Sequence, residues 1–420
     1  MYSVTPLPSN VRVATAEMPQ MESVSIGVWV GIGGRYEPKR ISGVSHFIEH
    51  LLFKGTRRRS ARQISEAVEG IGGYLNAFTG EESTCYYAKA GHKYLDTVLD
   101  VLADMYLHPR FATTDIDKER KVIKEELLMY RDQPDHYVHE LLTEAVWPEH
   151  PLGRALTGTV RSLDGMNRAT LLDFKRKKYI AANTIVAVAG KCRHEDVVSR
   201  VQRVLSLPRT AAAPGFVRAR DGQRVPQLRF LSRNVEQSHL ALAIRGYSRG
   251  DPRRFAMKLL SVMAGENMSS RLFQVIRERY GLAYSIQSST SFFADTGALI
   301  VSAGLDTKRL PKALELILRE LGKISKKPPS PVELRRAKDY SVGQMRLGLE
   351  STSNQMMWIG EHLLAYGFIH SPEEIERKIE AVTSDDIQSV AADLFRNHRL
   401  NAAVITPSKD ERTIASLLSF

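Results

Sequence analysis

Two stretches of the sequence follow one pattern: TCYYAKAGHKYLDTVLDVLADM at residues 84–105 and GALIVSAGLDTKRLPKALELILREL at residues 297–321. In each stretch, a short β-rich run precedes a segment whose apolar residues recur at helical spacing. Each stretch therefore predicts a strand followed by an amphipathic helix. One order of elements used twice along a chain indicates a duplicated domain.

The repeat extends toward the N-terminal side of both stretches. SVSIGVWVGIGGRYEP at 23–38 reads as a strand and turn, and QSHLALAIRGYSRGDP at 237–252 has the same pattern. A helix is predicted after each of these, at about 42–54 and in RFAMKLLSVMAGE at 254–266. Strands followed by helices in both halves favour an α+β fold. We expect two duplicated αβ-sandwich domains, each with helices packed on one face of a mixed or antiparallel sheet.

The composition of one central segment separates the two halves. Residues 207–227 are rich in Pro, Ala, Gly and Arg and have no apolar periodicity, as is typical of a linker. We therefore predict an N-terminal domain at 1–208, a linker at 209–226 and a C-terminal domain at 227–420. A chain of 420 residues is too long for one ordinary hydrophobic core.

Composition limits the class of protein. The chain is 43% hydrophobic and 25% charged, which is normal for a globular protein. Its longest apolar runs are far shorter than the roughly 18 to 20 residues needed to cross a bilayer, so no membrane span is expected. The N-terminus carries no export or transit pattern, so we expect a cytoplasmic protein. Cys85 and Cys192 are its two cysteines, too few for a disulfide framework or a thiolate metal cluster.

The net charge of +12 suggests nucleic-acid binding as a second class to consider. The basic clusters TRRRSAR at 56–62 and KRKK at 175–178 contribute to it. Clusters of this kind bind phosphate by counterion release, but neither has interleaved aromatic residues or a recognition motif. We therefore interpret them as solvated faces and expect no nucleic-acid partner.

Three ionisable residues lie within the first predicted helix, in the stretch VSHFIEHLLFKGT at 44–56. At about 100° per residue, His46, Glu49 and His50 fall within an arc of about 100° on the helix. Their neighbours are mostly apolar, so burial of these groups without a partner would be costly. A metal ion is such a partner, and zinc readily accepts two imidazoles one turn apart.

A catalytic zinc site needs a third protein ligand. No further Cys or His lies nearby at ligand spacing, so we expect a carboxylate from DIDKERKVIKEELLMYRD at 115–132. Glu119 and Glu126 are seven residues apart and share one face of that helix, whereas Glu125 points about 100° away. His136 and His139 also lie close to carboxylates, but their place just past Pro134 suits a helix surface better than a metal site.

Several motifs together resemble the M16 (pitrilysin or inverzincin) metallopeptidases, which carry a reversed H-x-x-E-H zinc motif. They are HFIEH followed by LLFKGT, then GGYLNAFTGEESTCYYAK, then ERKVIKEELLMYRDQPD. The sequence is most similar to the short-chain branch, which includes the mitochondrial processing peptidase β-subunit and bacterial processing-type proteases. The resemblance covers nearly the whole chain, including its duplication.

The resemblance implies roles for particular residues. The third zinc ligand of that branch corresponds to Glu126, which lies 76 positions after His50, and Glu119 would orient a ligand histidine. The family pattern R-x-x-x-x-L-x-Y falls on Arg277 and Tyr284 within MSSRLFQVIRERYGLAYSI at 268–286. By resemblance, these two residues reach the substrate from the C-terminal half.

The resemblance also implies an activity, a zinc-dependent endopeptidase that acts on unfolded peptides or presequence-like segments. Glu49 would move the proton of the attacking water, and Tyr284 would stabilise the oxyanion with help from Arg277. The strand edge around Asn76 and Ala77 would pair with an extended substrate. Family members imply a clam-shell arrangement of the two domains and a homodimer. The alternative is an inactive scaffold of the same fold or a partner subunit of a heterodimeric peptidase.

Overall fold

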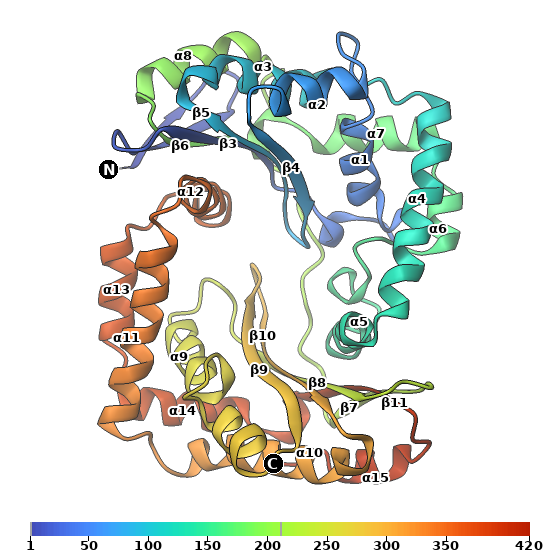
Figure 1. Cartoon of the computed structure of the whole chain (residues 1–420), viewed down its shortest axis with the longest axis vertical. Coiled ribbons are helices and arrows are strands. Elements are labelled where there is room, and N and C mark those ends of the chain that lie inside the picture. The colour runs from blue at the N-terminus through green and yellow to red at the C-terminus, as the bar shows by residue number, and fades with distance from the viewer. Residues whose placement is uncertain (1, 211) are drawn as a thin grey trace. The chain divides into compact units, whose positions relative to one another are not determined.

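The computed structural model describes residues 2–210 and 212–420, and its elements are labelled in Figure 1. The chain forms two compact units, each assembled from three segments. Unit 1 comprises Met1–Leu128, Arg154–Val217 and Arg346–Ser371. Unit 2 comprises Met129–Gly153, Arg218–Met345 and Pro372–Phe420.

Unit 1 is built on a six-stranded sheet with the strand order β1-β2-β6-β3-β5-β4. Its strands β2 and β6 are parallel, and the other neighbouring pairs are antiparallel. The strands are β1 Tyr2–Pro6, β2 Arg12–Glu17, β3 Ser23–Val30, β4 Tyr74–Thr79, β5 Thr84–Gly91 and β6 Thr184–Gly190. The sheet is therefore mixed, and β4 is one of its two edge strands.

Apolar side chains on both faces of the unit 1 sheet form two separate hydrophobic cores. In β3, Val24, Ile26 and Val28 pack into the larger core, whereas Trp29 packs into a smaller core on the opposite face. Successive strand side chains point to opposite faces, so the apolar run VSIGVWV supplies both. A sheet that is apolar on both faces needs a covering layer on each.

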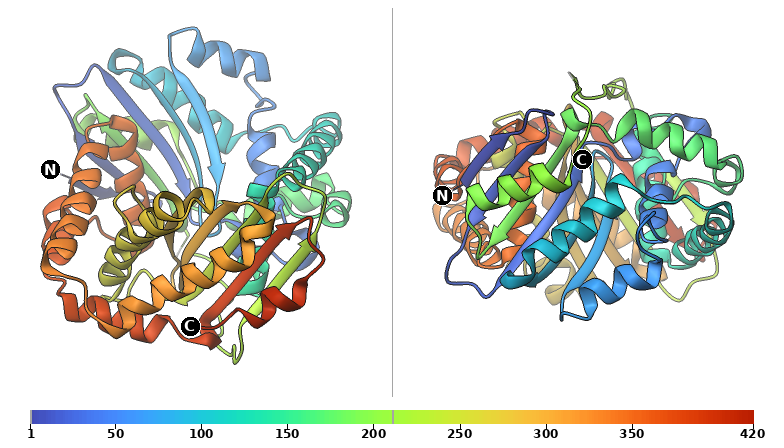
Figure 2. Two further views of the ribbon diagram at one scale, coloured as in Figure 1. Left: turned by 60° about the horizontal axis from the view of Figure 1, so that its bottom comes forward. Right: turned by 90° about the horizontal axis from the view of Figure 1, so that it is seen from above.

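Helices supply both layers of unit 1. The larger core lies between the sheet and most of these helices, which cover one side of the sheet in Figure 1 and lie over it in the view from above in Figure 2. These helices are α1 Val44–Leu52, α2 Ala61–Glu69, α3 Leu95–Leu107, α4 Thr113–Asp132, α6 Val160–Asp164, α7 Arg168–Lys178 and α8 His194–Val204. The smaller core is covered by α12, Thr352–Tyr366, through Met356, Ile359 and Leu363.

Unit 2 repeats the sheet of unit 1 without its first strand. The order is β7-β11-β8-β10-β9, with β7 and β11 parallel and the other pairs antiparallel. The strands are β7 Gln227–Ser232, β8 Ser238–Gly246, β9 Ala283–Phe292, β10 Gly297–Leu305 and β11 Leu400–Thr406. Because order and direction match β2-β6-β3-β5-β4, the predicted duplication and α+β fold class are confirmed.

The helices of unit 2 also follow the first half. Its larger core lies under α9 Arg254–Gly265, a π-helix Phe273–Arg279, α10 Leu310–Lys326, α11 Pro331–Gly348, α13 Pro372–Glu380, α14 Ser384–Leu394 and α15 Glu411–Ser416. The opposite face is covered by α5, Pro134–Val146, whose Val138, Leu142 and Val146 pack on Ala241 and Ala243 of β8.

Each half of the sequence thus contributes one helix to the other unit. Helix α5 comes from the first half and belongs to unit 2, while α12 comes from the second half and belongs to unit 1. The sequence predicted helices on one face of each sheet, and the structure adds this single helix on the opposite face. The boundaries at 208 and 227 stay a prediction. Among the described residues between α8 and β7 there is neither helix nor strand.

Candidate metal centre

Helix α1 carries the H-x-x-E-H motif and is fixed at its start by a distant carboxylate. The buried Glu37 side chain accepts hydrogen bonds from the backbone N–H groups of Gly43 at 2.6 Å and Ser45 at 2.7 Å. These are free donors at a helix N-terminus, where a carboxylate is favourable. Gly43 has φ of 90°, a backbone conformation that favours glycine. The apolar face of the helix is buried through Phe47, Ile48, Leu51 and Leu52.

Two elements bring the predicted ligands together. His46 and His50 lie one turn apart on α1, and Glu126 projects from α4. Glu126 Oε1 is 3.7 Å from His46 Nε2, and Glu126 Oε2 is 3.5 Å from His50 Nε2. One ligand atom from each of the three lies within 4.8 Å of the others. Among residues 2–210 and 212–420, this is the one such group of three or more His, Cys, Asp or Glu.

The donor set suits zinc. Zinc bonds of about 2.1 Å in tetrahedral geometry place neighbouring ligand atoms about 3.4 Å apart, close to the two distances at Glu126. Burial lowers the pKa of His46 from 6.5 to about 4, and nearby His50 adds to the effect. The imidazole of His46 is therefore neutral at pH 7, the form that binds a metal. Two imidazoles and one carboxylate leave one tetrahedral position for water or substrate.

The remaining nitrogen of His50 has a carboxylate partner. Its Nδ1 lies 3.1 Å from Glu119 Oε2, and Glu119 Oε1 pairs with Lys54 Nζ at 2.9 Å. A carboxylate behind a ligand histidine fixes its ring and its tautomer. The other histidine differs, because the buried Nδ1 of His46 has no hydrogen-bond partner. Lys54 was not identified from the sequence, although it lies four residues after His50.

Glu49 lies on α1 between the two histidines and does not belong to the ligand group. Thr79 Oγ1, at the end of β4, donates a hydrogen bond of 2.5 Å to Glu49 Oε2. Burial raises the pKa of Glu49, while the Thr79 hydrogen bond and His50 oppose that shift. A raised pKa suits a carboxylate that accepts and then releases a proton. Thr79 was also not identified from the sequence.

Strand β4 presents an open edge near these residues. Its neighbour is β5, with Asn76 opposite Tyr87 and Ala77 opposite Tyr86. The backbone N–H of Ala77 donates to the side chain of Asn76 at 2.8 Å rather than to β5, so it faces the open edge. Asn76 is exposed. The predicted substrate strand is therefore an edge strand with an outward-facing backbone donor.

Arg277 and Tyr284 lie in unit 2. Arg277 is part of the π-helix Phe273–Arg279, and its Cζ is 5.8 Å from the centre of the Tyr284 ring. Gly281 between them has φ of +56° and ends the helical segment before β9. Tyr284 is 79% exposed. An exposed phenol beside a guanidinium is available to bind a ligand, and π-helical segments are often found at functional sites.

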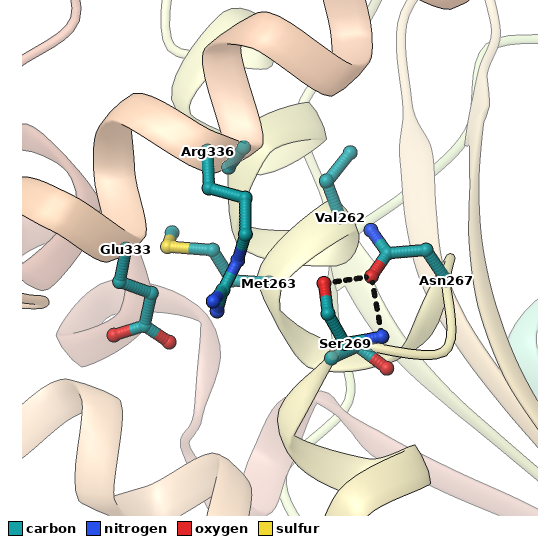
Figure 3. Close-up of a pocket in the computed structure, with 8 residues that line it drawn as sticks. Val262, Met263, Asn267, Ser269, Glu333 and Arg336 are labelled. Atoms are coloured by element: carbon teal, nitrogen blue, oxygen red, sulfur yellow. Dashed lines mark hydrogen bonds between the residues drawn. The ribbon is translucent and has the colours of Figure 1, made fainter.

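Two other features do not form sites. His136 and His139 lie on α5, and neither belongs to the metal-ligating group found among the described residues. A small pocket in unit 2 is lined by Asn267, Ser269 and Arg336 with their neighbours (Figure 3). Its cavity volume of about 10 Å³ has room for about one water molecule, so it is too small for a peptide or a cofactor.

Comparison with known proteins identifies the family. A profile described as "Insulinase (Peptidase family M16)" matches residues 12–160, and a profile described as "Peptidase M16 inactive domain" matches residues 165–340. The chain is 38% identical to an uncharacterized zinc protease of Mycobacterium tuberculosis, over 99% of this chain and 95% of that protein. It is 35% identical to the uncharacterized zinc protease YmxG of Bacillus subtilis, over 95% and 97%. The chain belongs to peptidase family M16.

Solved structures agree on the fold. The crystal structure of a protease from Helicobacter pylori matches with a TM-score of 0.91 and 21% identity, covering 97% of this chain and 99% of the other. A structure described as a peptidase M16 inactive domain from Pseudomonas fluorescens matches with a TM-score of 0.89 and 18% identity, over 97% and 98%. These two structures bear on the fold, while the family profiles and the zinc-protease relatives confirm the predicted family. No helix in the described part of the chain combines the length and hydropathy required to cross a bilayer.

Proposed function

We propose that the protein is a zinc-dependent endopeptidase that hydrolyses unfolded peptides or presequence-like segments. The observation that carries this proposal is the convergence of ligand atoms of His46, His50 and Glu126 within 4.8 Å. Glu49 lies close enough to interact electrostatically with His50 and Glu126. The names of the relatives support zinc as the metal, since they are described as zinc proteases. Imidazole nitrogen and carboxylate oxygen are both zinc ligands.

The residues divide the chemistry between them. His46, His50 and Glu126 hold the metal, which when bound supplies Lewis-acid activation of water and of the scissile carbonyl. Glu49 accepts the proton of the attacking water and passes it to the leaving amine. Glu119 holds His50 in the orientation in which its Nε2 faces Glu126. Hydrolysis on this scheme needs no covalent intermediate with the protein.

The edge of β4 binds the peptide in this proposal. An extended chain pairs with an open strand edge through backbone hydrogen bonds, which depend little on the peptide's side chains. The N–H of Ala77 is one donor for this pairing. Asn76 currently accepts that hydrogen bond at 2.8 Å and would release it on substrate binding. In folded proteins most backbone N–H and C=O groups are already hydrogen-bonded, so extended segments that are free to pair occur mainly in unfolded chains, which gives the proposed substrate class.

Arg277 and Tyr284 complete the proposed machinery. Tyr284 donates a hydrogen bond to the oxyanion, and Arg277 holds Tyr284 or the substrate backbone. The exposure of Tyr284 and the 5.8 Å contact of Arg277 with its ring support this assignment. We further propose a cytoplasmic homodimer, in line with the resemblance to short-chain members of the family.

An inactive scaffold of the same fold is the competing function. A scaffold needs neither metal ligands nor a general base at α1, and the presence of every proposed ligand together with Glu49 argues against it. The test compares the wild type with Glu49→Gln, using an unfolded, fluorescence-quenched peptide. Glu125→Gln is the matched control, since Glu125 is adjacent to a proposed ligand but outside the ligand group.

We expect Glu49→Gln to keep its zinc and to lose peptide hydrolysis by at least about a hundredfold. Glu125→Gln should resemble the wild type. Chelation should abolish wild-type hydrolysis, and added zinc should restore it. Equal hydrolysis by the wild type and Glu49→Gln would reject Glu49 as the base. A wild type that binds zinc but cleaves no unfolded peptide would favour the scaffold.

A further inference from the structure

We infer that Thr79 is a positioning residue. Its side chain orients the general base Glu49, and its backbone belongs to the strand edge at which the substrate would pair. The inference rests on the proposed function and deepens it. Its starting point is the hydrogen bond of 2.5 Å from Thr79 Oγ1 to Glu49 Oε2. Thr79 is the last residue of β4, the strand proposed to pair with the peptide.

The strand geometry gives Thr79 two directions of contact. Residues two apart along a strand share both their side-chain face and the direction of their backbone N–H and C=O groups. Ala77 has its side chain packed on the larger core of unit 1 and its N–H toward the open edge. Thr79 therefore has its side chain toward the face where α1 lies and its backbone toward the edge where a peptide would pair.

The turn after Thr79 is anchored to a separate loop of unit 1. Gly34 N donates to Gly80 O at 3.1 Å, and Arg35 N donates to Glu81 O at 2.8 Å. Arg35 also pairs with Glu82 at 2.6 Å. These contacts hold the end of β4, so the position of the Thr79 hydroxyl is set by the hairpin rather than by its own rotamer alone.

The consequence for Glu49 is a fixed carboxylate. Its Oε2 is occupied by the Thr79 hydroxyl, which leaves Oε1 as the oxygen available to the attacking water. A hydrogen bond to a charged group that fixes its orientation matters when the reacting atoms must be aligned. A peptide paired with β4 contacts the backbone of the same residue that orients the base. Strand β4 would thus position both the scissile bond of the paired peptide and the carboxylate that accepts the proton.

Thr79→Val tests the inference, because valine keeps the shape of threonine and removes the hydroxyl. We expect kcat for an unfolded peptide to fall about tenfold to a hundredfold, with KM and zinc content close to the wild type. Thr79→Ser should recover most of kcat. Thr84→Val is the matched control: it lies opposite Thr79 in the hairpin, and its hydroxyl donates to Ile32 O at 2.9 Å, not to Glu49. It should keep kcat.

A crystal structure of Thr79→Val gives a readout independent of activity. We expect the Glu49 carboxylate to leave its single wild-type position. The inference is overturned if Thr79→Val keeps the Glu49 position, if it keeps wild-type kcat, or if Thr79→Ser is as slow as Thr79→Val. Failure of the proposed function is distinguishable, because there the wild type itself cleaves no peptide while the Glu49 position in the crystals still decides the role of Thr79.

Discussion

Replacement of Gly360 by alanine tests the helix that covers the second face of the unit 1 sheet. Gly360 lies in α12 against the Trp29 ring of β3. A Cβ at Gly360 would lie 2.5 Å from Trp29 Cε2 and 2.8 Å from Cδ1, whereas carbon atoms in contact are separated by about 3.5 to 4.0 Å. Helix and ring must therefore separate by about 1 Å.

The ring has little freedom to accommodate this change. Trp29 is fully buried and packs edge-on against Phe78, with ring centroids 5.5 Å apart. Overpacking of this kind costs about 1 to 3 kcal/mol, offset by about 1 kcal/mol from the better helix propensity of alanine. With the ring held on both sides, we expect an overpacking cost of about 3 kcal/mol, the upper end of this range, so Gly360→Ala should lower the free energy of unfolding by about 2 kcal/mol after the offset.

Urea denaturation followed by tryptophan fluorescence and circular dichroism measures this change. Gly343→Ala in α11 is the matched control, since a Cβ at Gly343 meets no atom within 4 Å. That variant should gain up to about 1 kcal/mol from helix propensity. The two substitutions should thus shift the denaturation midpoint in opposite directions. If Gly360→Ala is as stable as Gly343→Ala, α12 does not pack on Trp29 and the assignment of this helix to unit 1 is wrong.

Three further predictions concern the metal centre and its helix. Glu126→Gln should lose most bound zinc by metal analysis while Glu125→Gln keeps it, and equal zinc in the two would refute the choice of Glu126. Zinc at about 1,000 times its Kd should stabilise the wild type by about 4 kcal/mol. Chelation should therefore lower the Tm of the wild type and leave the Tm of Glu126→Gln nearly unchanged. If chelation changes the Tm of neither protein, the result contradicts a metal site at these residues. Burial raises the pKa of Glu37 from 4.5 to about 7, so the folded state binds a proton that the unfolded state has released. The stability of the wild type relative to Glu37→Gln should therefore fall as pH rises from about 5 to about 7.5, and a pH-independent difference in urea denaturation would argue against this burial.

Much of the fold follows from local patterns. Apolar alternation in β3 and β8 and helical spacing in the segments after β5 and β10 depend on neighbours along the chain. They were sufficient to predict the duplication. The motif helix α1 was predicted in the same way, because His46 and His50 are one turn apart. The choice of Glu126 over Glu125 came from the family resemblance, and the distances to both histidines agree with it.

Other features depend on residues far apart in the sequence. The apolar faces of α5 and α12 indicate that each helix packs against a sheet. They do not indicate which sheet, since both sheets have apolar residues on that face. Glu37 lies six residues before Gly43 and is outside the usual N-cap position, so no capping signature identified it. Thr79 reaches Glu49 across 30 positions of sequence. Contacts of this kind are set by tertiary packing, which single-sequence patterns do not encode.

Helix α12, which the second half of the sequence contributes to unit 1, also bears on how the protein is synthesised. Strand β6 ends at Gly190, but α12, which covers the second face of its sheet, ends at Tyr366. At about 5 to 20 residues per second, a ribosome needs about 9 to 35 seconds to translate the intervening stretch. During that interval the face carrying Trp29 has no partner helix, and the nascent chain exposes an apolar surface of the kind that chaperones protect. A native unit 1 therefore cannot form until the chain has been translated through Tyr366.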